Sequence, residues 1–336
     1  MSTKAEVAVT GATGFIGSAV VRKLVSSGRN VRAIVEPGSN GANLEGLPID
    51  RVTCDVNDAK TLDKALDGIH TLYHLAAIYK TWTPDPERIY RINVEGTTTV
   101  LLAAQCAKVK RVIYTSSIAA IGIVDGGLAD ETTAFNLFDI ANPYILSKWQ
   151  SERIALRFAE SGLSLVVVNP AFPFGPGDLA PTPTGGIVLS VLEDKVPATS
   201  PGGFCAIDVD DCAAAHLAAE ERGRTGERYI LGNDNVTLKD FFDLVAKVAG
   251  KRPPRVSIPG ALVAGVALGM ELWADHVSHK EPQATYRSIL YAQRKAFFSN
   301  EKAKRELGLK TRPLEETVKR AVDWFREDYP RLRLTA

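Results

Sequence analysis

The first half of the chain alternates short runs of β-branched residues with amphipathic segments. Short apolar runs are typical of strands covered on both faces, and apolar positions repeated every three or four residues are typical of helices packed on a sheet. Strands that alternate with helices predict an α/β fold with a doubly wound, parallel Rossmann sheet. The predicted strands are residues 6–10, 30–35, 49–53, 71–74, 111–115 and 165–169. The predicted helices are residues 15–27, 58–66, 86–108 and 142–160.

The rhythm changes after residue 170. Prolines and glycines gather between residues 173 and 186, which predicts a long loop arching over a site. From about residue 209 the pattern is mainly helical, with one short strand at residues 228–231. We therefore expect two domains. They are a Rossmann domain of residues 1–175 and 203–232 and a smaller, mainly helical substrate-binding cap of residues 176–202 and 233–336.

The most apolar segment, residues 258–270, contains Pro259 and Gly260 and is followed by Glu271. A transmembrane helix needs about 20 apolar residues, so this segment is too short to cross a bilayer. We expect a helix that is buried or that lines a pocket, because short apolar segments are commonly part of a core. A peripheral contact with a membrane is the alternative.

The charge balance and the cysteines narrow the class of protein. The 336 residues include 40 Lys and Arg and 39 Asp and Glu, so the net charge of +1 leaves no basic surplus for a nucleic-acid groove. The four cysteines show no CxxC spacing and no dense pattern, which is typical of reduced thiols in a cytoplasmic protein. Met1 lies just before the first predicted strand, so we expect no signal peptide.

A glycine-rich turn joins the first predicted strand to the first predicted helix. Gly11 permits a tight turn, Gly14 lets the backbone approach a pyrophosphate, and Gly17 lets the helix pack closely on the sheet. Free N–H groups at the start of the helix and the positive end of its dipole then bind the phosphates. The position between a strand and a helix predicts a dinucleotide site rather than an ordinary glycine turn.

A tyrosine and a lysine four residues apart, Tyr144 and Lys148, share one face of a predicted helix. This helix follows the strand that ends at Thr115, and ligands of such sheets bind at the carboxyl edge of the strands. A ketone that accepts a hydride becomes an alkoxide and needs a proton. A neighbouring ammonium lowers the pKa of a tyrosine toward neutrality, so this pair is suited to moving that proton.

Other candidates for chemistry receive structural interpretations. Tyr291 and Lys295 repeat the spacing elsewhere, and we interpret them as a solvated helical face, so Tyr291→Phe is expected to be close to silent. His276 and His279 have no Cys or third ligand nearby, which favours a polar helix end over a metal site. His216 lies in an apolar run and is interpreted as a hydrogen-bonded helix residue rather than a base. We expect no metal.

Further motifs carry a resemblance to a known family. The turn reads TGxxGxxG from Thr10, residues 74–77 read HLAA, and residues 93–97 read NVEGT. With the YxxxK pair, these motifs resemble the extended short-chain dehydrogenase/reductases, which form the NAD-dependent epimerase/dehydratase family. Residues 166–178 resemble the family's R-P-x-N-V-Y-G-P-G segment, with Asn169 in place of the usual Arg. Nearly the whole chain is similar to the branch that holds dihydroflavonol-reductase-like proteins and the hopanoid-associated sugar epimerases.

The resemblance implies a role for each matched residue. Ser117, rather than Ser116, supplies the hydroxyl that polarises the carbonyl beside the tyrosine. Lys148 also binds the cofactor ribose, Asp55 faces the adenine amino group, and the backbone after Pro170 receives the nicotinamide carboxamide. The implied catalytic residues are Ser117, Tyr144 and Lys148. The implied cofactor contacts are Gly11, Thr13, Gly14, Phe15, Ile16, Gly17, Glu36, Asp55, Val56, Leu75, Ala76, Ala77, Thr115, Tyr144, Lys148, Pro170 and Phe172.

Glu36 distinguishes between the two nicotinamide cofactors. It lies 19 residues after Gly17, at the end of the second predicted strand, where an acid binds both ribose hydroxyls of NAD and repels a 2′-phosphate. The similar dihydroflavonol reductases have an Arg at this place. We therefore expect NAD, with NADP as the less favoured cofactor. In the alternative, Glu36 points to solvent and Arg32 or Arg51 binds the phosphate.

Three functions are compatible with these motifs: a carbonyl reductase, a nucleotide-sugar epimerase or dehydratase, and a noncatalytic cofactor-sensing protein. The third is disfavoured because the catalytic serine, tyrosine and lysine are all present. The family's sugar-nucleotide enzymes grip a diphosphate with the Arg of an R-D-F-V-x-V-x-D segment, and Phe204 stands at that place. We therefore predict an NAD(H)-dependent oxidoreductase that interconverts a hydrophobic ketone or aldehyde and its alcohol.

The predicted substrate and assembly involve further residues. An apolar pocket would suit a hydrophobic substrate, although its aromatic and aliphatic residues, apart from Phe172, could equally be core. The predicted pocket residues are Ile78, Tyr79, Trp82, Ser117, Phe172, Phe174 and Phe204. The resemblance also implies a homodimer, held by a four-helix interface of the helices at residues 86–108 and 142–160. The apolar residues of that interface would be Ile92, Leu101, Leu102, Ile154 and Phe158.

Overall fold

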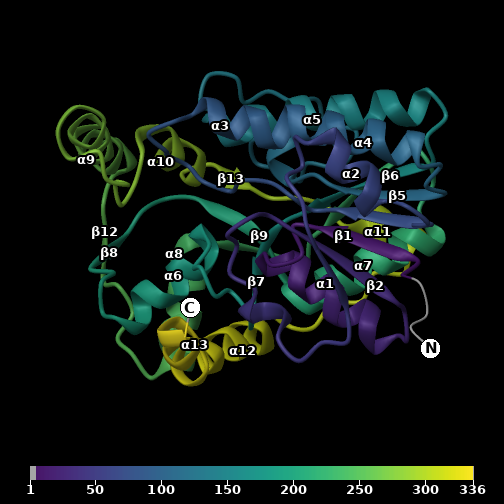
Figure 1. The fold of residues 1–336 in the computed structure, drawn as a ribbon. Helices are drawn as coiled ribbons and strands as arrows, with labels where there is room; N and C mark the ends of the chain where they lie inside the picture. The colour runs from purple at the N-terminus through teal and green to yellow at the C-terminus, as the bar shows by residue number, and fades with distance from the viewer. Residues whose placement is uncertain (1–4, 336) are drawn as a thin grey trace.

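A parallel sheet forms the centre of the protein. The computed structural model describes residues 5–335, in which seven parallel strands pair in the order β10-β6-β5-β4-β1-β2-β3 (Figure 1). The expectation of no signal peptide depends on the residues before the first strand, and residues 1–4 lie outside the described residues. The strands are β1 (Val7–Thr10), β2 (Val31–Val35), β3 (Asp50–Thr53), β4 (Thr71–His74), β5 (Arg111–Thr115), β6 (Leu165–Pro170) and β10 (Arg228–Leu231). The predicted Rossmann sheet is therefore confirmed, because its strands occur within one residue of the predicted ends.

Helices cover both faces of this sheet (Figure 1). On one face, α1 (Phe15–Ser26) packs against α7 (Val209–Arg222), and both contribute to one apolar core. On the other face, α4 (Thr97–Cys106) packs against α2 (Ala59–Ala65) and α5 (Pro143–Glu160) over a second core. This arrangement explains why the central strands are apolar on both faces.

The helix predicted at residues 86–108 is continuous but contains a π-helical turn. It consists of α3 (Glu87–Tyr90), a π-helical segment η2 (Arg91–Gly96) and α4, which follow one another without a break. π-Helical turns are rare and are found mostly at functional sites. Here the wider turn contains Asn93, whose side chain reaches the active-site helix, as described below.

A second, smaller sheet was not predicted. It joins β11 (Asp234–Thr237), β9 (Gly203–Asp208), β13 (Lys295–Ala296) and β7 (Phe172–Phe174). A separate pair is formed by β8 (Ala198–Thr199) and β12 (Val256–Ser257). Strand β9 was assigned to the Rossmann domain, yet its partners β11 and β13 lie in the predicted cap. The segment predicted as a long loop contains β7 and the start of α6 (Pro183–Leu192), where Thr182 accepts a hydrogen bond from the Gly185 N–H.

The cap has its own aromatic core. Helices α6, α8 (Leu238–Ala249) and α12 (Leu314–Glu327) pack against one another beside the small sheet. Phe174, Phe204 and Phe241 are buried there, with ring centroids 4.6 to 5.7 Å apart. The chain then ends with α13 (Tyr329–Thr335), which packs on α12.

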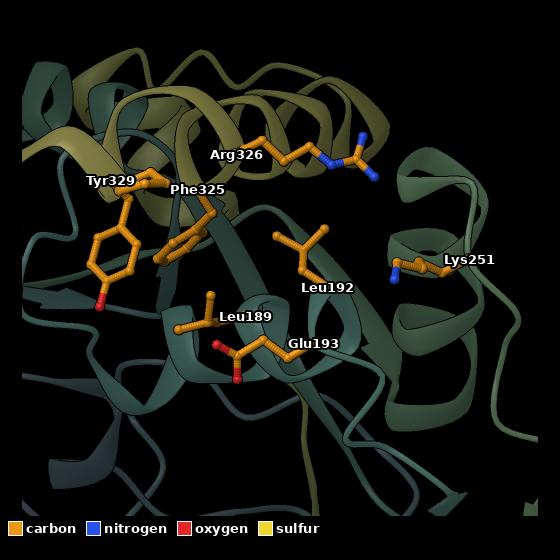
Figure 2. A pocket seen from close by; sticks show the side chains of 8 residues that line it. Leu189, Leu192, Glu193, Lys251, Phe325, Arg326 and Tyr329 are labelled. Atoms are coloured by element: carbon orange, nitrogen blue, oxygen red, sulfur yellow. The ribbon is translucent and has the colours of Figure 1, made fainter. Parts of the chain in front are cut away.

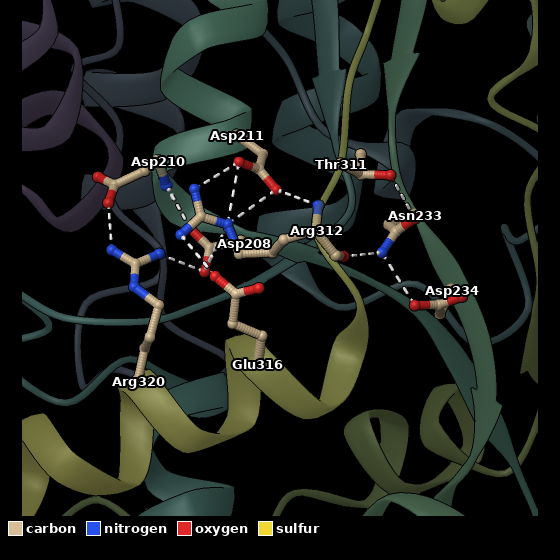
Figure 3. Close-up of polar contacts among 9 residues, drawn as sticks. All are labelled: Asp208, Asp210, Asp211, Asn233, Asp234, Thr311, Arg312, Glu316 and Arg320. Carbon is tan, nitrogen blue, oxygen red and sulfur yellow. Dashed lines mark hydrogen bonds and ion pairs between the residues drawn. The ribbon is translucent and has the colours of Figure 1, made fainter.

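Ion pairs join the cap to the sheet domain at the start of α7 (Figure 3). The buried Asp208 carboxylate accepts a hydrogen bond from Arg320 of α12 at 2.6 Å. Arg312 binds Asp211 at 2.7 Å and also pairs with Asp208 at 3.6 Å. The two guanidinium groups compensate for the burial of these carboxylates. The network therefore fixes the C-terminal helix against the domain that carries the predicted cofactor site.

The apolar segment near residue 260 is exposed rather than buried. It forms α9 (Gly260–Trp273), which projects from one end of the molecule and packs against α10 (Tyr286–Ala292) (Figure 1). Leu262 is 63% exposed and Trp273 is 61% exposed. The expectation of burial is therefore wrong, because only one side of α9 has a protein neighbour, whereas the expectation that the segment lines a pocket agrees with the groove beside Val266, Met270 and Trp273. Among the described residues, no helix is both long enough and apolar enough to cross a membrane.

Candidate active site

The glycine turn has the shape that a dinucleotide phosphate needs. Gly11 has a φ of +66°, and a Cβ there would lie 2.7 Å from the Ala76 backbone nitrogen. A Cβ on Gly17 would overlap the Gly11 carbonyl oxygen, so only glycine permits this packing. Helix α1 begins after Gly14, and in the described chain no side chain caps its first N–H groups. The free N–H groups and the helix dipole fit a pyrophosphate.

A buried histidine fastens this turn to the next strand. Thr10 Oγ1 lies 2.7 Å from His74 Nδ1 and accepts hydrogen bonds from the Leu75 and Ala76 N–H groups, each at 3.2 Å. Burial lowers the pKa of His74 to about 3, so this imidazole is neutral at physiological pH. It is a structural support that holds the predicted cofactor segment against the glycine turn, not a titrating catalyst.

The structure brings Ser117, Tyr144 and Lys148 together at the carboxyl edge of the sheet. Asn142 accepts a hydrogen bond from the Ile145 N–H at 3.0 Å and so begins α5 just before the tyrosine. Lys148 lies one turn later and donates from Nζ to the Thr115 carbonyl oxygen at 2.8 Å. Ser117 follows β5 and forms a hydrogen bond with the tyrosine hydroxyl. These are the three residues that the resemblance implies as catalytic.

Burial dominates the electrostatics of this group. It raises the pKa of Tyr144 to about 12, and the hydrogen bond with Ser117 opposes the shift. It lowers the pKa of Lys148 to about 8, against the attraction of Glu152. The sequence predicted that the ammonium would lower the tyrosine pKa. In the structure burial raises the Tyr144 pKa instead, so the phenol is protonated at physiological pH.

Asn93 connects the catalytic helix to the segment after β4, a role the sequence did not reveal. Its Nδ2 donates to Ser147 Oγ at 2.9 Å and to the Ile78 carbonyl oxygen at 3.1 Å. Its Oδ1 accepts the Ile78 N–H at 2.7 Å. The side chain is buried in the π-helical turn, so all three bonds are protected from water. Asn93 therefore fixes Ile78, a predicted pocket residue, relative to the turn that carries Tyr144 and Lys148.

Asn169, which replaces the family's usual Arg, holds the backbone of Ser117, the predicted catalytic serine. Its Nδ2 donates to the Ser117 carbonyl oxygen at 2.9 Å and to Glu152 at 2.5 Å. Glu152 lies one turn after Lys148 and also binds Arg228 at 2.9 Å. The Ser116 hydroxyl, in contrast, is buried without a hydrogen-bond partner among residues 5–335. This difference supports the choice of Ser117 over Ser116.

Tyr291 is part of the site, which corrects its interpretation as a solvated residue. It belongs to α10, packs with Tyr144 against the buried Ala119, Ala141 and Ile145, and has its pKa raised by burial and by the neighbouring Tyr144. Lys295 lies in β13 and is exposed, so the two residues do not share a helical face. The cause of the error is that α10 ends at Ala292 and folds back onto the catalytic helix.

The predicted pocket residues divide between the site and the core. The Tyr79 ring lies 4.7 Å from the Tyr144 ring, and Phe172 is half-buried. Phe174 and Phe204 are fully packed in the cap core, so neither is available to line a substrate pocket. A hollow of about 460 Å³ elsewhere, between α6, α12 and α13, is lined by Leu189, Leu192, Glu193, Lys251, Phe325, Arg326, Tyr329 and Pro330 (Figure 2). None of these belongs to the predicted site.

The surroundings of Glu36 include an arginine that the sequence did not indicate. Glu36 lies just after β2, is exposed, and pairs with Arg88 at 3.2 Å. Arg32, one of the two alternative phosphate ligands, instead binds Asp50 at 2.7 Å. The other, Arg51, donates to the carbonyl oxygen of Leu44. Arg88 is therefore the cation placed beside the predicted ribose contact.

His216 is a satisfied helix residue, as the sequence predicted. Its Nε2 lies 3.0 Å from Thr115 Oγ1, and its Nδ1 lies 2.8 Å from the Cys212 carbonyl oxygen. Burial lowers its pKa to about 4, so the ring is neutral. His216 therefore supports the end of β5 beneath the site.

Comparisons with known proteins agree with this geometry. Residues 7–232 match the family described as "NAD dependent epimerase/dehydratase family". The chain is 38% identical over 322 residues to a "Putative dihydroflavonol 4-reductase" of Synechocystis, which covers 94% of this chain and 93% of the relative. It is 33% identical over 320 residues to "Sterol demethylase protein B" of Methylococcus capsulatus, covering 95% and 98% of the two chains. The crystal structure of gox2253 superimposes with a TM-score of 0.86 at 41% identity, covering 96% of this chain and 98% of that one.

Proposed function

Because the chain belongs to the NAD-dependent epimerase/dehydratase family and is an NAD(P)-dependent oxidoreductase of the extended short-chain type, we propose that it interconverts a hydrophobic ketone or aldehyde and its alcohol. The observation that carries this choice is Phe204. Its ring is buried between Phe172 and Phe241, at the place where related sugar-nucleotide enzymes are expected to hold a diphosphate with an Arg. Because Phe204 stands there and is packed in the cap core, a diphosphate would lack the bidentate partner that an arginine supplies.

Proton transfer in the proposed reaction belongs to Tyr144. A bound nicotinamide supplies or accepts the hydride. With a pKa of about 12, the Tyr144 phenol is protonated at neutral pH and can deliver a proton to the oxygen of a reduced carbonyl. Ser117 hydrogen-bonds to the same oxygen as negative charge develops on it. Lys148 holds the end of β5 through Thr115 and presents a positive charge beside the ribose site.

The proposed cofactor site extends along the edge of β1, β2 and β4. The turn from Gly11 to Gly17 holds the pyrophosphate, and Glu36 binds the adenosine ribose. Asp55 is exposed, and while its Oδ1 accepts the Asn57 N–H at 2.9 Å, its carboxylate would face the adenine amino group. The backbone after Pro170 receives the nicotinamide carboxamide. We propose NAD as the preferred cofactor, because an acid stands at the ribose position.

A substrate screen tests the proposed function. We expect NADH oxidation with aliphatic, aromatic or steroid-like ketones and no turnover of sugar nucleotides, measured as loss of absorbance at the nicotinamide band. A Tyr144→Phe preparation is the matched control for contaminating reductases. Turnover of a sugar nucleotide without net NADH consumption would instead support an epimerase and overturn the proposal. Cofactor binding without turnover of any tested compound would favour the noncatalytic alternative.

We further propose a homodimer that packs α4 and α5 of one protomer against those of its partner. Ile92, Ile154 and Phe158 are half-buried and Leu102 is 50% exposed, whereas Leu101 belongs to the core and is withdrawn from the interface. Multi-angle light scattering at micromolar concentration should give the mass of two chains. Leu102→Glu should shift the protein toward a monomer because the charge would lie in an apolar interface. Leu128→Glu, at a residue 56% exposed elsewhere, is the control. A monomeric wild-type protein contradicts this prediction.

A further inference from the structure

Helix α9 presents an apolar surface to solvent. Its exposed side chains include Leu262 at 63%, Val266 at 60%, Leu272 at 49% and Trp273 at 61%. Contiguous exposed apolar surface of this kind marks an interaction site. We infer that α9 docks this protein on the surface of an anionic lipid bilayer.

The distribution of side chains around α9 favours a bilayer. Successive residues of an α-helix are about 100° apart, so the exposed positions from Leu268 through Leu262 to Met270 cover roughly 200° of the circumference. Every residue of α9 within this arc is apolar, alanine or glycine. The one charged residue of the helix, Glu271, lies on the opposite side and accepts the Tyr286 N–H at 2.7 Å.

A second copy of the chain would cover this surface incompletely. A helix that packs on one partner needs an apolar stripe of about 100°, half the width of the arc found here. A helix of 14 residues is about 21 Å long and about 10 Å wide, so its footprint is roughly 200 Å². A stable protein interface buries about 800 Å² per partner. A bilayer, in contrast, covers a wide arc without a specific partner.

The charges around α9 complement anionic headgroups. Arg252 and Arg255 precede the helix and Lys280 follows it, and all three are exposed with no ion pair among the described residues. The nearby acids are exposed but have partners, since Asp275 accepts a hydrogen bond from Trp82 at 2.8 Å and Glu281 pairs with Lys80 at 3.4 Å. Basic side chains beside an apolar face are typical of binding to anionic membranes.

The geometry also sets how deep the helix lies. A length of about 21 Å is shorter than the hydrocarbon core of about 30 Å, so α9 would lie in the plane of the interface. Trp273 suits that depth, because tryptophan prefers the level of the headgroups. A groove of about 580 Å³ beside it is lined by Val266, Met270, Trp273 and Lys280, among others. This groove places an apolar wall next to Lys280, and Glu281, which also lines it, is paired with Lys80.

The bilayer surface is connected to the proposed active site. The Trp82–Asp275 hydrogen bond ties the segment after β4, which also contains Tyr79, to the end of α9. Helix α10 packs against α9 and carries Tyr291 to the catalytic tyrosine. Docking through α9 would therefore place the membrane beside elements that contact Tyr144. This last step rests on the proposed function, whereas membrane binding itself does not.

Vesicle flotation tests the inference. The wild-type protein is mixed with vesicles of phosphatidylcholine alone, or of phosphatidylcholine with phosphatidylglycerol at about three to one, and we expect flotation mainly with the anionic vesicles. The triple variant Leu262→Ser, Val266→Ser and Trp273→Ser should bind at least about a hundredfold more weakly, since each large apolar side chain contributes strongly to partitioning. Arg252→Gln with Arg255→Gln should weaken binding to anionic vesicles about fivefold per charge. Leu128→Ser is the control and should float like the wild type.

A second measurement does not depend on the fold of the triple variant. Trp273 emission should shift to shorter wavelength with anionic vesicles and be quenched by brominated lipid, and Trp273→Phe should lose this response. Wild-type protein that floats with neither vesicle overturns the inference. A wild-type dimer that becomes a monomer in the triple variant, with no flotation of either, assigns α9 to a second copy and also overturns it. Neither assay needs turnover, so failure of the proposed function is detected separately, with a water-soluble ketone.

Discussion

Tyr144→Phe is expected to lower kcat by about 10²–10⁴-fold while leaving the dissociation constant of the nicotinamide cofactor nearly unchanged. The substitution removes only the hydroxyl that is hydrogen-bonded to Ser117. It keeps the ring that packs against Tyr79. The two effects are measured separately, by steady-state ketone reduction and by titration of cofactor fluorescence. A variant with near wild-type kcat would exclude Tyr144 as the proton carrier.

The same tyrosine predicts that the rates of ketone reduction and alcohol oxidation depend differently on pH. The pKa of about 12 keeps the phenol protonated through the neutral range, so ketone reduction should be nearly independent of pH there. Alcohol oxidation needs the phenolate, whose population rises about tenfold per pH unit below the pKa. The logarithm of kcat/KM for oxidation should therefore rise with a slope near one between neutral pH and the pKa of Lys148, about 8. Tyr144→Phe should abolish this slope.

Tyr291→Phe is an informative second variant, because in the structure Tyr291 packs beside Tyr144 and the substitution is no longer expected to be silent. The Tyr291 ring packs with Tyr144 on the same buried alanines, so loss of its hydroxyl changes the polarity beside the proton carrier. We expect a smaller loss of kcat/KM than for Tyr144→Phe, mainly because KM for the ketone rises. Tyr286, exposed on the same helix, provides the silent control as Tyr286→Phe. If Tyr291→Phe and Tyr286→Phe both match the wild type, Tyr291 acts only in packing.

NADH is expected to exceed NADPH in kcat/KM by roughly tenfold to a hundredfold. A hydrogen bond to a charged group is worth about 1.5–3 kcal/mol, which corresponds to that range. Glu36 supplies the bond to the ribose and repels a 2′-phosphate. Its ion pair with Arg88 does not prevent this, because both side chains are more than half exposed and such pairs contribute little. Initial rates with each cofactor at a fixed ketone concentration give the ratio.

Two variants and a control separate the contributions of the charged residues near the ribose. Glu36→Arg should narrow or reverse the preference, because a guanidinium can bind a phosphate with two hydrogen bonds. Arg88→Ala should increase the preference for NADH, since the substitution removes the cation beside Glu36 that would attract a 2′-phosphate. Arg32→Ala should leave the ratio unchanged, because Arg32 is engaged with Asp50. Wild-type preference for NADPH would mean that Glu36 turns away from the ribose and that Arg88, rather than Arg32, binds the phosphate.

Features set by neighbouring residues in the chain could be predicted from the sequence. The central strands and the helices between them follow from local apolar periodicity, which each segment carries by itself. The turn from Gly11 to Gly17 was also predicted, since Gly17 is required by its contact with Gly11 in the same turn, although the contact that requires glycine at position 11 is with Ala76. Tyr144 and Lys148 were paired by helical spacing alone. The second sheet was missed, because β7 and β13 are very short and its strands come from segments far apart in the chain.

Other features of the site depend on residues far apart in the chain. Asn169, Glu152 and Arg228 meet only when β6, α5 and β10 lie side by side, and no spacing in the sequence indicates that contact. Asn93 was seen as part of a motif, but its bonds to Ser147 and Ile78 depend on the π-helical turn.

The sequence by itself determined the Rossmann sheet and predicted the phosphate turn and the tyrosine–lysine pair, because each is encoded by a short stretch of the chain. Tertiary structure decided the rest. It brought Tyr291 from α10 onto Tyr144, buried Phe204 in the cap, and raised the tyrosine pKa by removing water from around it. It also left α9 with a protein neighbour on one side only. Burial is a property of the packed chain, so an apolar segment alone cannot show whether protein or another apolar phase covers it.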